Sequence, residues 1–133
     1  LRYWLDVDRY QFYDQSNVAI IPMGFCYPGR LPNGGDKPPR PECAPLWHPL
    51  LLQNLPNIEL TVLAGAYAQK RFLGDRRGKS LTETVQEWKK FGPDLFPLPH
   101  PSWRTVGWQN RNPWFESDVL PDLRYRVRQL LCQ

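Results

Sequence analysis

Three short apolar runs constrain this chain most strongly. They cover residues 18–21, 60–64 and 95–99, and each is bounded by turn residues or proline, which is typical of buried strands. Helical patterns lie between them, for example over residues 66–73. Because strands that alternate with helices form parallel sheets, their carboxyl ends meet at one edge. The sequence therefore predicts an α/β fold, a three-layer α/β/α sandwich around a short parallel sheet of three strands.

Several further elements follow from local signals. Leu1, Trp4 and Leu5 have helical spacing, and Ser80 followed by Glu83 has the pattern of a capping box that begins a helix. A helix is expected around residues 44–55, with a kink at Pro49. The last helix is expected to begin with Asn112 as its N-cap and Pro113 at its first position. Residues 23–41 form a long loop rich in proline and glycine.

The bulk composition indicates a globular chain. A length of 133 residues predicts a single α/β domain over residues 1–133. The formal charge of +4 and the pI of about 9.1 favour a polyanionic partner without requiring one. Arg76, Arg77 and Lys79 form a basic loop, for which the simplest interpretation is a solvated surface and the alternative is contact with nucleic-acid phosphates.

The cysteines indicate a reducing compartment. The chain has three of them, Cys26, Cys43 and Cys132, and an odd number without a CxxC pair argues against a secreted disulfide scaffold. No apolar run approaches the 18–20 residues, roughly, that a membrane span needs. We therefore expect an intracellular protein without a membrane partner.

The residues after the third apolar run are candidates for chemistry. His100 follows at the expected carboxyl end of the strand, where open α/β sheets bind ligands. Pro99 and Pro101 restrict the backbone on either side, and Ser102 can bond a phosphate. Trp103 and Arg104 add a flat ring and a planar cation. A capping or loop histidine without chemistry is the alternative interpretation.

The segment Leu98-Pro99-His100-Pro101-Ser102-Trp103-Arg104 resembles the second signature loop of the uracil-DNA glycosylase superfamily, especially its single-strand-selective branch. Residues 61–70, Thr-Val-Leu-Ala-Gly-Ala-Tyr-Ala-Gln-Lys, resemble the strand–glycine–helix segment of the same superfamily. Cys26-Tyr27-Pro28 and the segment around Cys43 resemble its iron-sulfur branch. The likeness covers about residues 1–131 and is strongest to a bacterial group of uracil-DNA glycosylase family proteins.

This resemblance implies a role for each residue of the loop. His100 would be the catalytic donor to the O2 atom of the leaving base, where a neutral imidazole in a strand-end pocket suffices. Ser102 would bind a flanking phosphate, while Trp103 and Arg104 would fill the gap that base flipping leaves in the stack.

The same resemblance indicates a base pocket and a possible cluster. The base pocket would comprise Pro22, Met23, Gly24 and Phe25, and proline stands where the family has its uracil-reading asparagine. Cys26 and Cys43 would be two of four ligands of a 4Fe-4S cluster, and two unrelated buried thiols are the alternative interpretation. We expect the other two cysteines, the first strand and the family's Gly-x-x-Pro-Gly-type loop to lie N-terminal to residue 1, so that residues 1–133 are the C-terminal portion of the domain.

Taken together, the resemblance implies a base-excision repair enzyme. It would bind DNA and hydrolyse the N-glycosidic bond of uracil or a related damaged pyrimidine, as a monofunctional glycosylase without strand nicking. The resemblance also implies a monomer in the bacterial cytoplasm, associated with the nucleoid. The alternative is a non-catalytic nucleic-acid-binding or structural member of the same fold, which Pro22 and the missing first motif favour. An α/β hydrolase is disfavoured because the chain has no Gly-x-Ser-x-Gly nucleophile elbow.

Overall fold

The computed structural model describes residues 1–132 of the chain. These residues separate into two compact units, the first made of residues 1–18 with 59–132 and the second of residues 19–58. The single domain over residues 1–133 stays a prediction.

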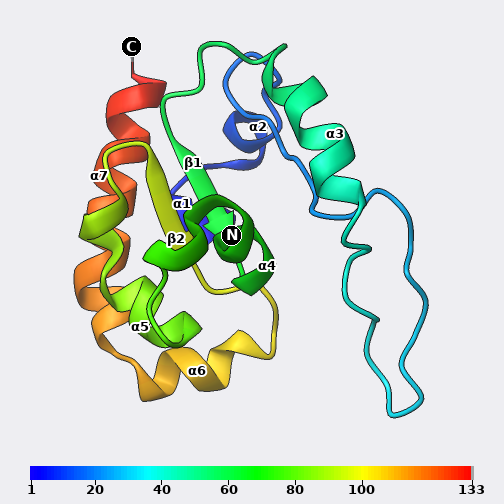
Figure 1. The fold of residues 1–133 in the computed structure, drawn as a ribbon. Coiled ribbons are helices and arrows are strands. Elements are labelled where there is room, and N and C mark those ends of the chain that lie inside the picture. Colours follow the sequence, from blue (N-terminus) through cyan, green and yellow to red (C-terminus); the bar gives the residue numbers. More distant parts are fainter. Residues whose placement is uncertain (133) are drawn as a thin grey trace. The chain divides into compact units, whose positions relative to one another are not determined.

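The first unit contains a parallel two-stranded sheet (Figure 1). Strand β1 (Thr61–Ala64) pairs with β2 (Leu95–Leu98), with Thr61 opposite Leu95 and Ala64 opposite Leu98. The N–H of Gly65 donates to the carbonyl of Leu98 at 2.9 Å and continues the pairing beyond the ladder. The carboxyl ends of both strands therefore meet at one edge, as the sequence predicted for these two runs.

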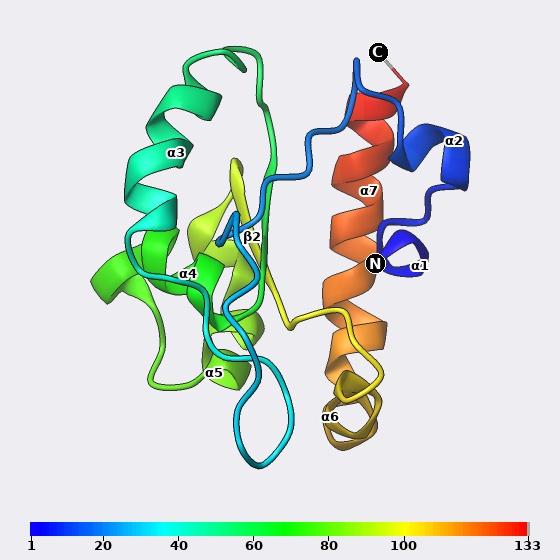
Figure 2. The same cartoon turned by 90° about the vertical axis from the view of Figure 1, so that its right-hand side faces the viewer.

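Helices cover both faces of this sheet. Leu63 points to the face covered by α4 (Ala66–Leu73), where it packs with Leu73. Phe96 and Leu98 point to the other face and pack against α1 (Arg2–Leu5) and α7 (Leu120–Leu131). Figure 2 shows β2 between α4 and α7. The predicted three-layer α/β/α arrangement with a short parallel sheet is confirmed within the first unit.

Short helices complete the first unit. They are α2 (Arg9–Phe12), η1 (Gly74–Arg76), α5 (Leu81–Gln86), η2 (Trp88–Phe91), α6 (Thr105–Arg111) and the π-helical turn η3 (Phe115–Val119). The Ser80 hydroxyl accepts from the Glu83 N–H at 3.1 Å, which confirms Ser80 as the N-cap of α5.

The second unit contains α3 (Cys43–Leu52), with Pro49 inside the helix, and a long loop. An isolated antiparallel bridge joins Arg30 to Asp36 within that loop. The Tyr27 hydroxyl donates to the Asp36 carboxylate at 3.1 Å. Partial desolvation, and then this bond, raise the pKa of the tyrosine.

Two predictions about secondary structure are wrong. Residues 18–21 form no strand, because they have no ladder neighbour among residues 1–132, and Ile20 is 64% exposed. The sheet accordingly has two strands in the described part of the chain, not three. Asn112 does not begin a helix: its side-chain amide donates to the Trp108 carbonyl at 2.8 Å, so it ends α6 instead.

Within residues 1–132, no helix has both the length and the apolar character that crossing a bilayer requires.

Candidate active site at the end of strand β2

The loop that follows β2 places His100 at the carboxyl edge of the sheet. Pro99 is buried and anchors the start of the loop, whereas the His100 side chain is exposed. The sequence predicted a histidine within a strand-end pocket, and the structure instead presents this imidazole at the surface of the first unit. An exposed imidazole at this edge is accessible to a large ligand such as DNA.

Two hydrogen bonds fix the backbone of His100. Its carbonyl accepts from the Ser102 N–H at 2.9 Å and from the Thr105 hydroxyl at 2.5 Å. Thr105 is 8% exposed and is the first residue of α6, so the turn of the loop is tied to a helix. The sequence analysis did not identify Thr105, although a hydroxyl residue shortly after a tight turn is a common local partner for turn carbonyls.

Gly65 lies directly against His100. It ends β1 and precedes α4 with φ +95° and ψ 171°, a conformation that favours glycine. A Cβ added at Gly65 would lie 3.3 Å from the Cβ of His100. The absence of a side chain at Gly65 therefore lets the β2 loop approach the end of β1, and this contact joins two of the sequence segments that resemble the superfamily.

Gln69 ties the two strand ends to α4. It is 1% exposed, and its amide nitrogen donates to the carbonyls of Leu98 at 2.8 Å and Leu63 at 3.4 Å. Sequence reasoning quoted Gln69 only as part of the resemblance and assigned it no role. The spacing of α4 could have identified Gln69 as buried: Leu73 follows four positions later, so both side chains lie on the inner face of the helix.

The remaining loop residues form an exposed polar and aromatic surface beside His100. Ser102 is half-buried, with its hydroxyl 3.5 Å from that of Thr105. Trp103 is 79% exposed, and the guanidinium carbon of Arg104 lies 5.3 Å from the centre of its ring. An indole with an arginine over its face offers a broad, flat contact surface for a nucleobase or a phosphate.

The candidate base-pocket residues belong to the second unit. The Pro22 carbonyl lies 2.8 Å from Nε2 of His48, which is 2% exposed in α3. The Phe25 ring lies 6.2 Å from the rings of both Trp47 and His48. Residues 22–25, including Met23 and the half-buried Gly24, are thus anchored on α3 through Pro22 and Phe25. Their role in reading a base stays a prediction.

The sequence model of the uracil DNA glycosylase superfamily matches residues 1–124. The chain belongs to this superfamily. The predicted resemblance is confirmed at that level, and the matched range includes both the Gly65–Gln69 segment and the His100 loop. Members of the uracil-DNA glycosylase superfamily are in general DNA glycosylases, hydrolases that act on DNA.

The cysteines of this superfamily member fit a four-thiolate cluster only in part. All three are free thiols: Cys43 is buried at the start of α3, while Cys26 and Cys132 are exposed. Among residues 1–132, no group of three or more histidine, cysteine or acidic side chains is arranged to hold a metal ion. Cys26 and Cys43 as ligands, and the cluster itself, stay predictions.

Proposed function

We propose that this protein is a monofunctional DNA glycosylase that hydrolyses the N-glycosidic bond of uracil or a related damaged pyrimidine. The observation that carries the proposal is the exposed His100, held at the carboxyl end of β2 by Thr105 and Gly65. Superfamily membership supports glycosylase chemistry in general. The three free thiols support a reducing compartment such as the bacterial cytoplasm.

The chemistry requires a donor at one defined place. When the bond between the sugar carbon and the base nitrogen breaks, the base keeps the electron pair and negative charge grows on its O2 atom. A ring N–H of His100 would donate to that oxygen while water adds to the sugar carbon. The proton that water loses ends on the released base, which balances the hydrolysis. The anchored backbone of His100 supports this role, because a pre-positioned donor needs little reorganisation during the reaction.

The target base must first leave the DNA stack. Extruding it costs a few kcal/mol, roughly, in lost stacking and pairing. Trp103 and Arg104 are exposed next to His100 and would occupy the emptied position, and the Ser102 hydroxyl would bind a flanking phosphate. The loop would thus supply both the catalytic donor and the groups that keep the base extruded.

The test is excision from a uracil-containing oligonucleotide by the intact protein, followed by alkali to cleave abasic sites. We expect alkali-dependent cleavage that requires uracil, with a thymine-containing oligonucleotide as the matched substrate. The His100→Ala variant should lose about 10²–10³-fold in rate, the typical loss when one donor to a developing oxyanion is removed. Circular dichroism of the variant checks that it folds.

Two results would overturn the proposal. The first is an intact protein that leaves no abasic sites in single- or double-stranded uracil DNA. The second is a folded His100→Ala variant that excises uracil as fast as the parent. Strand cleavage without alkali would contradict the monofunctional mechanism.

A further inference from the structure

The charge of the chain is concentrated in one segment. Residues 70–90 contain seven of the 17 lysines and arginines and three of the 13 acidic residues, so the rest of the chain has ten of each. The formal charge of +4 therefore resides entirely in this segment. Such a concentration of positive charge is typical of a surface that binds a polyanion, because evenly distributed charge would not create a local positive electrostatic potential.

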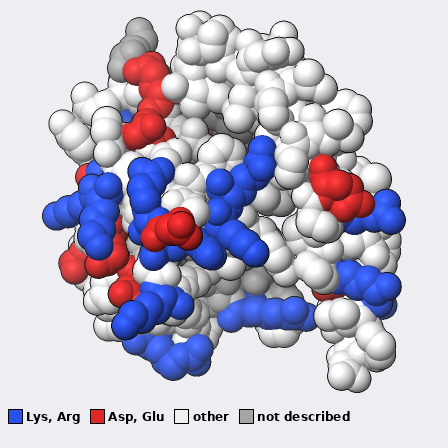
Figure 3. All heavy atoms as spheres, viewed as in Figure 1, with Lys and Arg blue, Asp and Glu red and all other residues white. Residues whose placement is uncertain are grey.

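The cations of this segment are exposed on the first unit. They lie on the end of α4, on η1, in the loop before α5 and on η2. Figure 3 shows lysine and arginine atoms gathered over the region of α4 and α5. Five of these side chains, which we call the basic surface, have no carboxylate within 4 Å among the described residues: Lys70, Arg76, Arg77, Lys79 and Lys89.

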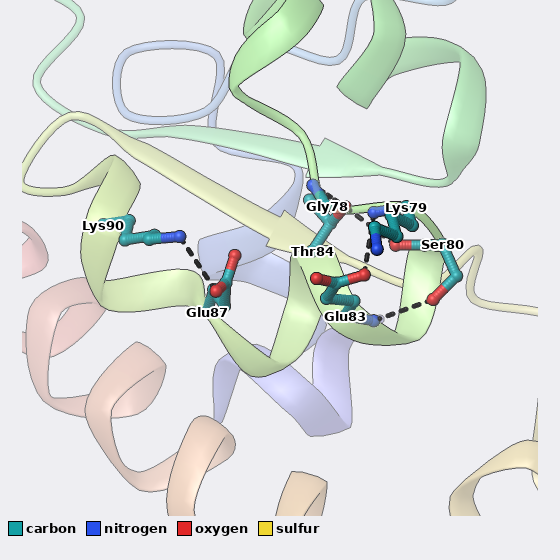
Figure 4. A network of polar contacts seen from close by, with 7 residues as sticks. All are labelled: Gly78, Lys79, Ser80, Glu83, Thr84, Glu87 and Lys90. Atoms are coloured by element: carbon teal, nitrogen blue, oxygen red, sulfur yellow. Dashed lines mark hydrogen bonds and ion pairs between the residues drawn. The ribbon is translucent and has the colours of Figure 1, made fainter.

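Among the described residues, none of the three acidic side chains of the segment (Asp75, Glu83 and Glu87) forms an ion pair with the basic surface. Glu87 pairs with Lys90 at 2.8 Å. The Glu83 carboxylate accepts from the backbone N–H of Lys79 at 2.8 Å, which leaves the Lys79 ammonium without a partner carboxylate (Figure 4). In a complete capping box the Glu83 carboxylate would accept from the Ser80 N–H. It accepts instead from the N–H one residue earlier, and this bond holds the basic loop.

The basic loop is ordered by its own hydrogen bonds. The Gly78 N–H donates to the Thr84 hydroxyl at 3.1 Å, and that hydroxyl donates to the Ser80 carbonyl at 2.9 Å. A Cβ at Gly78 would lie 2.7 Å from Cγ of Glu83, so a larger residue would disturb the loop. A loop ordered in advance loses less conformational entropy when its cation binds a ligand.

The guanidinium groups of η1 are also held against the fold. Arg76 donates to the Phe72 carbonyl at 3.3 Å, and Arg77 donates to the Gly74 carbonyl at 3.1 Å. Each bond uses part of the five-donor guanidinium and leaves further N–H groups available. Two adjacent, partly anchored guanidinium groups suit the oxygens of a phosphate.

The segment lacks the features of a surface for lipid or protein partners. None of the exposed large hydrophobic side chains among the described residues lies within residues 70–90. Membrane-surface helices bury apolar side chains in the interface, and protein interfaces rely on aromatic and aliphatic anchors. A surface of cations without apolar anchors matches the sequence-independent binding of nucleic-acid phosphates.

We propose that the basic surface is a second DNA contact, which binds the duplex backbone away from the nucleotide at His100. Choosing DNA as the polyanion rests on the function proposed above. The surface and the His100 loop share one unit: Gly65, which lies against His100, is the N-cap of α4, and Lys70 follows five residues later, about 8 Å along the helix. Also, the Trp108 indole of α6 donates to the Thr82 hydroxyl of α5 at 2.8 Å. The basic surface would therefore contact phosphates further along the backbone from the extruded nucleotide.

The test measures how the affinity of the intact protein for an undamaged thymine-containing duplex depends on salt, by fluorescence anisotropy. The variant Arg76→Gln/Arg77→Gln is compared with Arg9→Gln/Arg128→Gln, which removes the same charge from exposed positions in α2 and α7. The slope of log affinity against log salt is negative for DNA binding. We expect Arg76→Gln/Arg77→Gln to make this slope less steep by about 1.8, or about 0.9 per lost phosphate contact. The second pair should leave the slope unchanged.

An unchanged slope in Arg76→Gln/Arg77→Gln would overturn the proposal, as would an equal fall in both double variants, because net charge alone would then explain it. Binding of the parent to vesicles of anionic phospholipid but not to duplex would also overturn it. Uracil excision by the parent and by His100→Ala is measured separately. If Arg76→Gln/Arg77→Gln makes the salt dependence less steep but the parent excises no uracil, the glycosylase proposal is refuted and the proposed DNA contact of the basic surface is retained.

Discussion

Replacing Gly65 by alanine tests whether the contact between the ends of β1 and β2 positions His100. The substitution acts on the backbone and on the neighbour at the same time. With φ +95° and ψ 171°, Gly65 occupies a region that is essentially restricted to glycine, and an alanine there costs about 1–3 kcal/mol. The new methyl carbon would also stand 3.3 Å from Cβ of His100, so the loop must move by a few tenths of an ångström.

We expect both a loss of stability and a loss of rate per folded molecule. The free energy of unfolding should fall by about 2 kcal/mol, the middle of the backbone cost. A misplacement of 1 Å can reduce a rate by about 10²-fold, so a shift of a few tenths of an ångström corresponds to a roughly fivefold lower kcat/KM.

Gly74→Ala is the matched control. Gly74 also has a positive φ, +53°, but a Cβ added there meets nothing within 4 Å. Alanine at Gly74 should therefore destabilise the fold through backbone strain without displacing His100.

Urea unfolding followed by tryptophan fluorescence measures stability, and excision under conditions in which each variant is fully folded measures rate. The reasoning is refuted if Gly65→Ala is as stable as the parent. It is equally refuted if Gly74→Ala loses as much kcat/KM as Gly65→Ala.

Three further substitutions test other contacts. Thr105→Val removes the hydroxyl that donates to the His100 carbonyl, which should lower the free energy of unfolding by about 1 kcal/mol and lower kcat more than it raises KM. Thr105→Ser keeps a hydroxyl and should retain kcat. A Thr105→Ser variant as slow as Thr105→Val would argue against the bond. Gln69→Met keeps similar volume but removes the donor to both strand carbonyls, so urea unfolding should show a loss of about 1–3 kcal/mol. Full stability of that variant would show that the buried amide contributes nothing. Ser80→Ala removes the acceptor for the Glu83 N–H and should cost about 1 kcal/mol, with Ser80→Thr as a control that retains a cap; equal losses in both would exclude capping as the cause.

The elements that the sequence predicted correctly are those whose start and end signals lie within a few residues of the element itself. Gly65 and Gly74 bound α4 at both ends, and the helix runs from Ala66 to Leu73 as expected. Likewise, β2 occupies residues 95–98 of the predicted run 95–99.

The elements that sequence did not predict depend on distant partners. Helix α6 has weak local signals, since it contains Gly107 and begins with the β-branched pair Thr105 and Val106. Trp108 holds it in place, through ring contacts with Phe115 at 5.3 Å and Trp114 at 5.7 Å. Conversely, residues 18–21 have an apolar pattern but no ladder neighbour among residues 1–132, so they form no strand.

By itself, the sequence determined that His100 follows a buried strand, that a glycine ends the other strand, and that the charge of the chain is concentrated in residues 70–90. Only the tertiary structure decided which groups surround these features. The register of β1 and β2 brings Gly65 against His100, although 34 residues separate them along the chain. The packing that buries Gln69 places its amide nitrogen against the carbonyls of Leu63 and Leu98. Local signals specify turns, caps and periodicity, whereas contacts across the sheet depend on the simultaneous packing of segments that no short window of sequence contains.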